Sequence, residues 1–311
     1  MKILVTGATG LIGQQLCAKL ASEGHELVVL TRSLASARKV THTSAFVWQP
    51  ETELPPAAAL IGVTAVIHLA GEPVAGRWTP ERKRSIRASR VLGTRHLVQA
   101  MQQQAQQQAQ QQAHVLVSGS AVGYYGNCGD EKLTEQAQPG DSFLGEVCAA
   151  WEAEARQAEA FGTRVVLLRT GVVLDPAGGA LKTMLPAFNL GVAGKLSDGR
   201  QWFPWIHRDD ILGLLRLALL NETVSGPLNG AAPNPVTNEE FTKELAAVLN
   251  RPAFLPVPKF ALNVLFGEMA SVVLASQRVI PQAALDAGYV FRFPWLRAAL
   301  QDLFQTRHEE G

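Results

Sequence analysis

The spacing of apolar residues changes abruptly near the N-terminus. Residues 3–5 form a continuous apolar run, typical of a buried strand, whereas Ile12, Leu16 and Leu20 recur at helical spacing. Residues 26–30 then have the pattern of a second strand. The chain therefore begins with a predicted strand, a tight turn and a helix that leads into a second, parallel strand.

Strand patterns alternate with helical ones up to Gly171, and prolines, glycines and tryptophans interrupt the alternation beyond it. The further predicted strands are residues 45–48, 63–69, 115–118, 164–169 and 289–293. The further predicted helices start near residue 81 and cover about 143–160, 211–220, 238–249 and 296–304. This order predicts an α/β protein with a doubly wound parallel sheet of the Rossmann type and a smaller C-terminal substrate lobe. We expect the Rossmann domain to cover residues 1–171 and to receive elements from about 203–232, with the lobe covering 172–311.

Polar residues mark the starts of the predicted helices. Side-chain oxygens at these positions can accept hydrogen bonds from the first free backbone N–H groups of a helix. The predicted caps are Thr79 followed by Pro80, Asp141 or Ser142, Asp209 or Asp210, and a capping box of Thr237 with Glu240.

Glycines lie where the first strand turns into the helix. Gly7, Gly10 and Gly13 allow the backbone to bend sharply, to approach a pyrophosphate and to pack closely on the sheet. The helix N-terminus would present free N–H groups to the phosphates. We predict a dinucleotide site, although a glycine-rich turn also occurs in α/β proteins without one. The predicted contacts are Gly7, Thr9, Gly10, Leu11, Ile12 and Gly13.

The end of the second strand indicates which dinucleotide binds. A carboxylate there would bind the ribose hydroxyls of NAD, whereas an arginine accommodates the additional phosphate of NADP. Here the strand is followed by Thr31, Arg32 and Ser33, without an acid. We therefore predict NADP, with these three residues near its phosphate. The alternative is that Arg32 is an ordinary surface residue.

The composition excludes several classes of protein. A chain of 311 residues that is 47% hydrophobic can bury a full core, and a net charge of +1 offers no overall footprint for nucleic acid or an anionic membrane. Cys17, Cys128 and Cys148 lack metal-ligand spacing. No apolar run approaches the roughly 18 residues of a membrane helix. We expect a cytoplasmic monomer or homodimer without metal, nucleic-acid or membrane partners.

A glutamine-rich stretch separates the helix that starts near residue 81 from the next strand. Residues 102–113 repeat QQQA. Glutamine and alanine tolerate a helix, but the repeat contains no apolar stripe. We expect a helical extension or a loop that does not pack, and assign it no function.

Several loop motifs resemble those of extended short-chain dehydrogenases and sugar-nucleotide epimerases. TGATGLIG has the glycine spacing of that family, HLAG is similar to its fourth-strand motif, and SGSAVGYYG is similar to its serine loop. The resemblance implies that Leu69, Ala70, Gly71 and Ser118 border the cofactor. It also implies that Ser120 is the catalytic serine, which bonds the reacting hydroxyl or carbonyl oxygen.

Three further side chains are candidates for proton transfer or substrate binding. Tyr124 and Tyr125 resemble the aromatic residue of the family motif VYG, and either can form a pocket wall or transfer a proton. Tyr125 is our candidate of the two. His207 is the other acid/base candidate, because an imidazole titrates near neutrality. Arg278 can reach a substrate phosphate or pair with an acid.

The helix that carries YxxxK in the extended family departs from that pattern here. Aligning the family's following glutamate with Glu152 puts Leu144 in the tyrosine position and Cys148 in the lysine position. Arg90, in RVLGTRHL, takes the place of the family asparagine. An arginine cannot relay protons in the same way, but it can bind a phosphate or a carboxylate. We expect Cys148 to be a neutral packing residue beside the nicotinamide ribose.

The retained serine and these replacements together resemble the atypical YfcH-type branch, the "epimerase family protein" group. The resemblance extends nearly end to end and includes QWFPWIHRDD, GPLNGAAPNPVTNEEF and FGEMASVVLASQRVIPQAALDAGYVFRFP. It implies an NADP-dependent oxidoreductase or nucleotide-sugar epimerase acting on a small molecule, with nucleotide sugars as one class. The alternative is an NADP-binding sensor or regulatory protein that has lost the chemistry.

Overall fold

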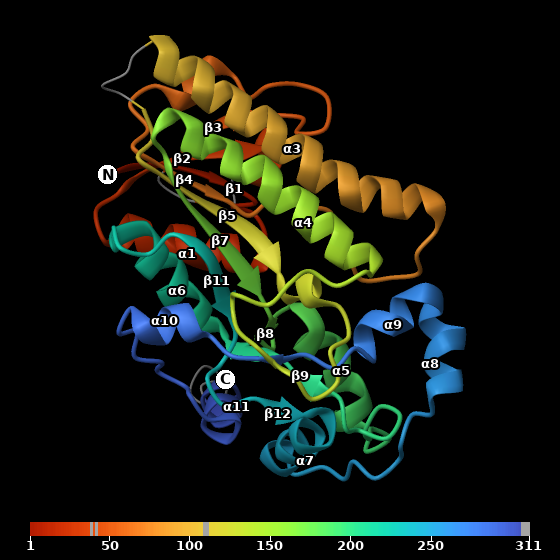
Figure 1. Cartoon of the computed structure of the whole chain (residues 1–311). Coiled ribbons are helices and arrows are strands. Elements are labelled where there is room, and N and C mark those ends of the chain that lie inside the picture. Colours follow the sequence, from red (N-terminus) through yellow and green to blue (C-terminus); the bar gives the residue numbers. More distant parts are fainter. Residues whose placement is uncertain (38–39, 41–42, 108–111, 306–311) are drawn as a thin grey trace.

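The computed structural model describes residues 1–37, 40, 43–107 and 112–305. Within them, parallel strands form a seven-stranded sheet with neighbours in the order β11, β7, β5, β4, β1, β2 and β3 (Figure 1). The predicted doubly wound parallel sheet is thereby confirmed. The strands are β1 (Lys2–Thr6), β2 (Glu26–Thr31), β3 (Thr43–Val47), β4 (Ala65–His68), β5 (Val115–Ala121), β7 (Arg164–Thr170) and β11 (Gly226–Gly230).

Successive residues of the central strands pack on opposite faces of the sheet. In β1, Ile3 and Val5 belong to the hydrophobic core on one face, and Leu4 belongs to the core on the other. Helices α1 and α6 contribute to the first core, whereas α3 and α4 lie side by side over the second (Figure 1). These helices are α1 (Leu11–Ser22), α3 (Pro80–Gln107), α4 (Phe143–Arg156) and α6 (Arg208–Leu220).

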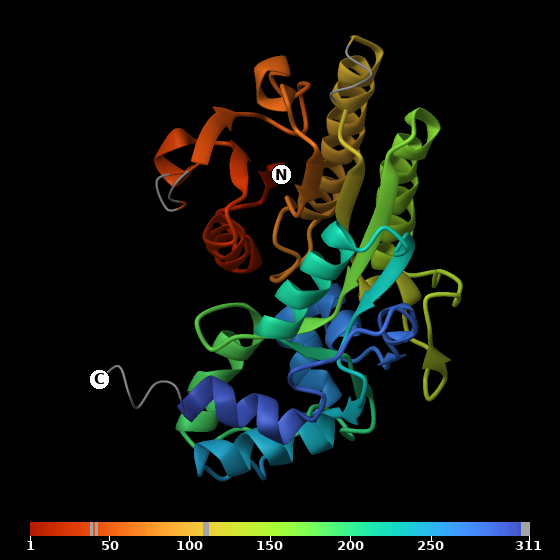
Figure 2. The same cartoon turned by 90° about the vertical axis from the view of Figure 1, so that its left-hand side faces the viewer.

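The last strand of the sheet comes from a distant part of the sequence. Strand β11 pairs in parallel with β7, so that residues 226–230 extend the sheet built by the N-terminal half. The chain thus leaves the sheet after β7, builds part of the lobe, and returns to the sheet through α6 and β11 (Figure 2).

The C-terminal lobe has its own hydrophobic core. Helices α5, α7 and α11 supply most of its buried residues, together with the aromatic side chains of Trp205, Phe241 and Phe293. The remaining helices are α2 (Leu34–Ala37), α5 (Gly179–Asn189), α7 (Asn238–Leu249), α8 (Lys259–Phe266), α9 (Ala270–Val273), α10 (Gln282–Asp286) and α11 (Leu296–Gln305), with 3-10 helices η1 (Ala57–Leu60), η3 (Val122–Tyr125), η4 (Gln157–Phe161) and η5 (Gly267–Met269). The short strands are β6 (Lys132–Leu133), β8 (Val172–Leu174), β9 (Trp202–Phe203), β10 (Trp205–His207), β12 (Val236–Thr237) and β13 (Arg278–Val279). None of the described helices is both long and apolar enough to span a bilayer.

The caps of four helices were predicted, and three of the predictions are confirmed. Thr79 precedes α3, and its hydroxyl accepts from the backbone N–H of Arg82 at 3.2 Å. The Ser142 hydroxyl accepts a hydrogen bond from the backbone of Gly145, and Thr237 with Glu240 forms the capping box. Helix α6 differs, because His207 caps it by accepting from the backbone N–H of Asp209 through Nδ1 at 3.1 Å. The aspartates that we expected to cap this helix bind elsewhere.

The predicted strand at residues 289–293 does not form. Its segment is anchored to α6 by the carboxylate of Asp210, which accepts from the backbone N–H groups of Arg292 at 2.8 Å and Phe293 at 2.9 Å. Tyr289 lies 3.3 Å from the same carboxylate through its hydroxyl. A side chain thus satisfies backbone donors that a neighbouring strand would otherwise satisfy.

The glutamine-rich stretch packs more than predicted. Helix α3 continues to Gln107, and Gln104 and Ala105 are buried, each with 8% of its surface exposed. The predicted helical extension is therefore confirmed as far as Gln107, whereas the expected lack of packing is wrong for this part. Residues 108–111 of the repeat lie outside the described residues.

Asp210 is expected to stabilise the fold far more than its neighbour Asp209. Asp210→Ala removes the acceptor of two backbone N–H groups in a buried position, which costs about 3 kcal/mol of unfolding free energy. Asp209→Ala removes an exposed ion pair with Arg292 and costs at most about 1 kcal/mol. Urea unfolding of both variants measures the difference, and equal losses would contradict the anchoring role.

Candidate functional site

The turn after β1 brings three segments of backbone into very close contact. Gly7 has φ +70°, and a Cβ atom there would lie 2.7 Å from the carbonyl carbon of Leu69. A Cβ on Gly13 would lie 2.2 Å from the carbonyl oxygen of Gly7. Gly10 caps α1 without a side-chain hydrogen bond. The first amides of α1 are therefore open to an anion, as a pyrophosphate requires.

Two cavities meet at this turn. One has a volume of about 300 Å³ and the other about 430 Å³, and both are lined by Gly7, Gly10 and Leu69. A long ligand bound across the turn would occupy both, which fits the two halves of a dinucleotide. The predicted contacts that line them are Gly7, Thr9, Gly10, Leu11, Ile12, Gly13, Thr31, Arg32, Leu69, Ala70 and Gly71.

The sequence patterns did not identify some lining residues, and the predicted contacts Ser33, Ser118, Arg90 and Cys148 line neither cavity. Trp48 and Glu72 line the first cavity, and Thr170 lines the second, yet no motif marked them. Ser118 is fully buried, and its hydroxyl donates to the Gly119 carbonyl at 3.3 Å. Ser33 donates its backbone N–H to the Thr31 hydroxyl at 3.3 Å and so shapes the end of β2.

A buried histidine fixes the loop after β4. The ring nitrogens of His68 lie 2.7 Å from the Thr6 hydroxyl and 3.0 Å from the Thr94 hydroxyl. Thr6 also accepts from the backbone N–H of Ala70 at 3.1 Å. Burial lowers the pKa of His68 to about 4, so the ring is neutral at physiological pH. His68 therefore positions the segment that lines both cavities.

A carboxylate lies beside the predicted phosphate-binding arginine. Arg32 forms a short ion pair with Glu72, and Arg82 lies 3.7 Å from the same carboxylate. The Arg32 side chain is 67% exposed, so it can turn toward a ligand in the first cavity without loss of packing. The sequence reasoning found no acid at the end of β2, but the tertiary structure brings one from the loop after β4.

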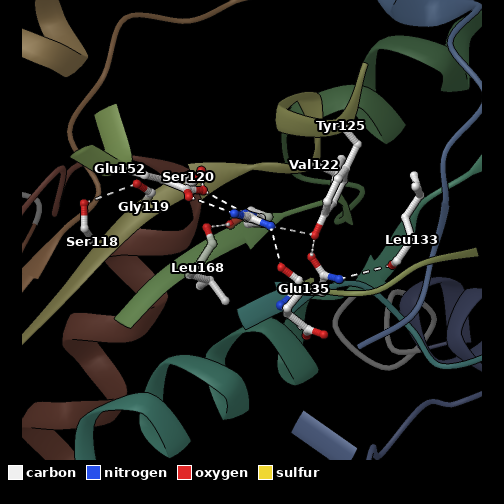
Figure 3. Close-up of polar contacts among 12 residues, drawn as sticks. Ser118, Gly119, Ser120, Val122, Tyr125, Leu133, Glu135, Glu152 and Leu168 are labelled. Atoms are coloured by element: carbon white, nitrogen blue, oxygen red, sulfur yellow. Dashed lines mark hydrogen bonds and ion pairs between the residues drawn. The ribbon is translucent and has the colours of Figure 1, made fainter. Parts of the chain in front are cut away.

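Ser120 begins a buried chain of polar contacts (Figure 3). Its hydroxyl donates to Oε1 of Glu152 at 2.7 Å. Both oxygens of Glu152 accept from Arg169, at 2.8 and 2.9 Å. Burial lowers the pKa of Arg169, but its contacts with Glu152 outweigh this effect and raise it above the usual value. The guanidinium is therefore permanently charged and holds Glu152 in one orientation.

Tyr125 belongs to the same chain of contacts. Its hydroxyl donates to Oδ1 of Asn229 at 2.6 Å and lies 3.0 Å from a nitrogen of Arg169 (Figure 3). The residue is 1% exposed, and burial raises its pKa to about 12. A phenol that is buried and bonded in this way is a poor proton donor, so the geometry does not favour the predicted acid/base role. The neighbouring Tyr124 stacks on Arg169 at 3.5 Å from its guanidinium carbon.

The positions of the usual tyrosine and lysine are occupied by packing residues. Leu144 packs on Gly123, where a Cβ atom would lie 3.2 Å from the leucine. Cys148 is 3% exposed, and burial raises its pKa to about 11 despite the nearby Ser120 hydroxyl and the charge of Arg90. A neutral thiol is therefore expected, as the sequence suggested.

Arg90 lies between the first cavity and Cys148. Its guanidinium donates to the backbone carbonyl of Glu72 at 3.0 Å, and a Cβ on Gly71 would lie 3.2 Å from its central carbon. It also lies 5.3 Å from the ring centre of Trp151. These contacts hold a positive charge directly behind the loop that lines the cavity.

His207 and Arg278 are placed in the lobe. His207 is fully buried, its ring centre lies 3.9 Å from that of Phe293, and its Nε2 lies 3.4 Å from Asp302. Burial lowers its pKa. Because Nδ1 caps α6, the geometry does not favour the predicted role in proton transfer. Arg278 lies 3.5 Å from Asp130 and thus pairs with an acid.

A third cavity, of about 250 Å³, lies near the N-terminal end of α4. Its walls come from Trp78, from the loop after β5, from the first turn of α4, and from residues 268–277 of the C-terminal region. Leu144 is one of the lining residues. The cavity therefore adjoins the helix turn that carries Cys148.

Two family models match the chain. The model described as NAD dependent epimerase/dehydratase family matches residues 3–229. The model described as Domain of unknown function (DUF1731) matches residues 257–303, which include one wall of the third cavity. The first agrees with the family that the loop motifs resemble.

Curated relatives align over almost the whole chain. Epimerase family protein SDR39U1 homolog, chloroplastic, from Arabidopsis thaliana is 42% identical over 308 residues, which cover 98% of this chain and 87% of that protein. Epimerase family protein YfhF from Bacillus subtilis is 36% identical over 313 residues, which cover 99% of each.

Solved structures share the fold. Human epimerase family protein SDR39U1 (isoform2), crystallised with NADPH, matches with a TM-score of 0.86 at 34% identity over 98% of this chain and 99% of that chain. A nucleoside-diphosphate sugar epimerase from Corynebacterium glutamicum matches with a TM-score of 0.77 at 33% identity, over 100% of this chain and 61% of that one. MoeE5 in complex with UDP-glucose and NAD, at 23% identity and a TM-score of 0.76 over the full length of both chains, shows the shared fold alone.

The buried pair of Glu152 with Arg169 is expected to dominate the stability of α4. Glu152→Ala leaves Arg169 buried without its counter-charge, which costs about 3–5 kcal/mol. Glu154→Ala, on the same helix, breaks a surface pair with Arg95 and costs at most about 1 kcal/mol. Chemical denaturation distinguishes the two variants. A similar small loss in both would show that the buried pair is not required.

Proposed function

Because this chain belongs to the NAD dependent epimerase/dehydratase family, we propose that it uses NADP(H) to move a hydride to or from a carbon atom of a small-molecule alcohol or carbonyl compound. The observation that carries the proposal is the pair of cavities that meet at the glycine turn, with Arg32 in one of them. Human SDR39U1 with NADPH supports the choice of cofactor. The corynebacterial relative makes nucleotide sugars one class to test as substrate.

Backbone amides and one exposed arginine would hold the cofactor. The amides at the start of α1 would bind the pyrophosphate, and Arg32 would exchange Glu72 for the 2′-phosphate. Arg90 keeps a positive charge behind the loop at Gly71. When bound, the nicotinamide supplies the hydride acceptor or donor.

Ser120 lies at the same edge of the sheet as the second cavity. Its neighbour Ala121 pairs with Thr170, and Thr170 lines that cavity. Because the Ser120 hydroxyl donates to Glu152, its oxygen lone pairs can accept a hydrogen bond from a substrate hydroxyl. A proton leaving that hydroxyl would pass through Ser120 toward Glu152, whose position Arg169 fixes.

This route explains how the site can work without the tyrosine and lysine of the extended family. Leu144 cannot ionise, and the pKa of Cys148 is raised to about 11, so neither side chain replaces the tyrosine or the lysine. We assign the binding of the substrate hydroxyl and the proton transfer to Ser120 and Glu152. Tyr125 and His207 have structural roles. The alternative of a sensor that binds NADP(H) without turnover predicts no hydride transfer with any substrate.

Arg32 is expected to determine the preference for NADPH. Arg32→Ala should weaken NADPH binding by about tenfold to a hundredfold, since it removes a charge-assisted contact, while NADH binding stays nearly unchanged. Glu72→Gln should strengthen NADPH binding several-fold, because it removes a negative charge beside the phosphate and releases Arg32. Calorimetry measures both, with the surface variant Arg84→Ala as the control. Equal affinities of the wild type for NADPH and NADH would refute the assignment.

Ser120 is expected to be required for hydride transfer. Ser120→Ala should lower the single-turnover rate by at least about a hundredfold and leave NADPH affinity within about twofold, because the hydroxyl acts on the substrate oxygen. Ser22→Ala, an exposed change on α1, serves as the control. The decay of nicotinamide absorbance after mixing with a panel of alcohols, carbonyl compounds and nucleotide sugars provides the measurement. Tight NADPH binding without transfer to any of them would favour the sensor.

A further inference from the structure

The third cavity has walls from four separate parts of the chain, one of which is Trp78. Gly123 and Asn127 come from the loop after β5, Phe143 and Leu144 from the start of α4, and Val272 from α9. Its volume is about 250 Å³. The wall that contains Val272 lies in the region matched by the domain of unknown function.

Helix α4 extends from the wall of the cavity to the neighbourhood of Ser120. Leu144 lines the cavity, and Cys148 lies one helical turn further along the same face. Burial raises the pKa of the Cys148 thiol, and the neighbouring Ser120 hydroxyl counteracts part of this effect. Because Leu144 takes the position of the tyrosine of the extended family, the cavity lies beside the place where that family positions the reacting oxygen.

The lining offers little to a charged ligand. Among the described residues, no lysine or arginine lines the cavity, and the single charged side chain there is the carboxylate of Glu268. Lys83 lies outside the lining and pairs with Glu268 at 2.6 Å. A diphosphate needs cations or several free N–H donors, and a carboxylate beside it would repel it.

The polar side chains of the wall are already bonded within the protein. Gln277 donates to the backbone carbonyls of Val122 at 2.8 Å and Gly126 at 2.9 Å. Trp78 donates through Nε1 to the Val74 carbonyl at 2.9 Å, and Ser271 donates to the Glu268 carbonyl at 2.7 Å.

The remaining amide and hydroxyl of the wall each accept one hydrogen bond from the backbone. Asn127 accepts from the backbone of Ser276 at 2.8 Å, and Ser142 accepts from Gly145 at 3.1 Å. The rest of the wall is formed mainly by Trp78, Phe143, Leu144, Val272 and Ala275, whose apolar surfaces favour an apolar ligand over the hydroxyl groups of a sugar.

The adjacent surface does not offer a diphosphate site either. A larger hollow of about 580 Å³ lies on the other side of the contact between Asn127 and Ser276. Its charged lining residues are Asp130, Asp198, Glu239 and Arg200. Three acids against one base make this hollow unfavourable for a nucleoside diphosphate.

We propose that the substrate is an uncharged, largely apolar carbonyl compound or the corresponding alcohol, bound between Phe143, Leu144 and Val272, and that nucleotide sugars are not substrates. This inference rests on the proposed function for its chemistry. A cavity of about 150 Å³ holds benzene, so about 250 Å³ corresponds to roughly ten non-hydrogen atoms. In the reducing direction, hydride from NADPH adds to the carbonyl carbon, the C=O π pair moves to oxygen, and a proton delivered through Ser120 gives the alcohol and NADP⁺.

The test uses the full-length protein loaded with NADPH and three probes, namely acetophenone, cyclohexanone and UDP-glucose. Ligand-observed NMR gives the dissociation constants, and nicotinamide absorbance follows hydride transfer. We expect at least one ketone to bind about tenfold or more tightly than UDP-glucose. Val272→Trp should weaken ketone binding by about tenfold or more, because the indole fills the cavity, and should leave NADPH affinity unchanged.

Val264→Trp is the matched control, because Val264 is 60% exposed on α8 and does not line the cavity. If Val272→Trp does not fold, as loss of NADPH binding would indicate, the test uses Val272→Phe, which introduces a smaller side chain. UDP-glucose binding as tight as that of the ketones, or ketone binding unaffected by both changes at Val272, would overturn the proposal and leave the proposed function standing. Ketone binding that Val272→Trp abolishes, without hydride transfer, would support the assigned pocket and count against the proposed function.

Discussion

The buried ion pair between Glu152 and Arg169 is the interaction on which the arrangement of the site depends. Arg169 lies near the end of β7 and Glu152 lies on α4, and the pair also orients Ser120 from β5 and Tyr125 from η3. Two charges that are almost completely buried are tolerable only when each satisfies the other with good geometry. Their bidentate contact meets this condition and fixes the relative positions of the four elements.

This pair also accounts for a site that lacks the usual tyrosine and lysine. In the extended family the helix that corresponds to α4 supplies both groups, whereas here it supplies Glu152 and two packing residues, Leu144 and Cys148. The polar side chain that faces Ser120 is thus a carboxylate held by an arginine from a neighbouring strand. The chemistry that we propose follows from this replacement of the tyrosine and lysine by Glu152 and Arg169.

The C-terminal region completes the molecule in two different ways. Asp210 anchors the segment at Arg292 and Phe293 without a strand, and residues 268–277 close the third cavity against α4. Both contacts join segments that are far apart in the sequence. The region matched by the domain of unknown function therefore contributes a wall of this cavity as well as packing.

The sequence by itself determined the parallel sheet, the glycine turn and most helix starts, because each depends on local spacing or on one capping side chain. Gly7, Ser142 and Thr237 were identified for this reason. Only the tertiary structure showed that Glu72 forms an ion pair with Arg32 and that Glu152 forms one with Arg169. Such contacts depend on the order of strands in the sheet, and no local pattern records that order. The same limit explains why the sequence offered Tyr125 as a proton donor, although its hydroxyl is buried and donates to Asn229.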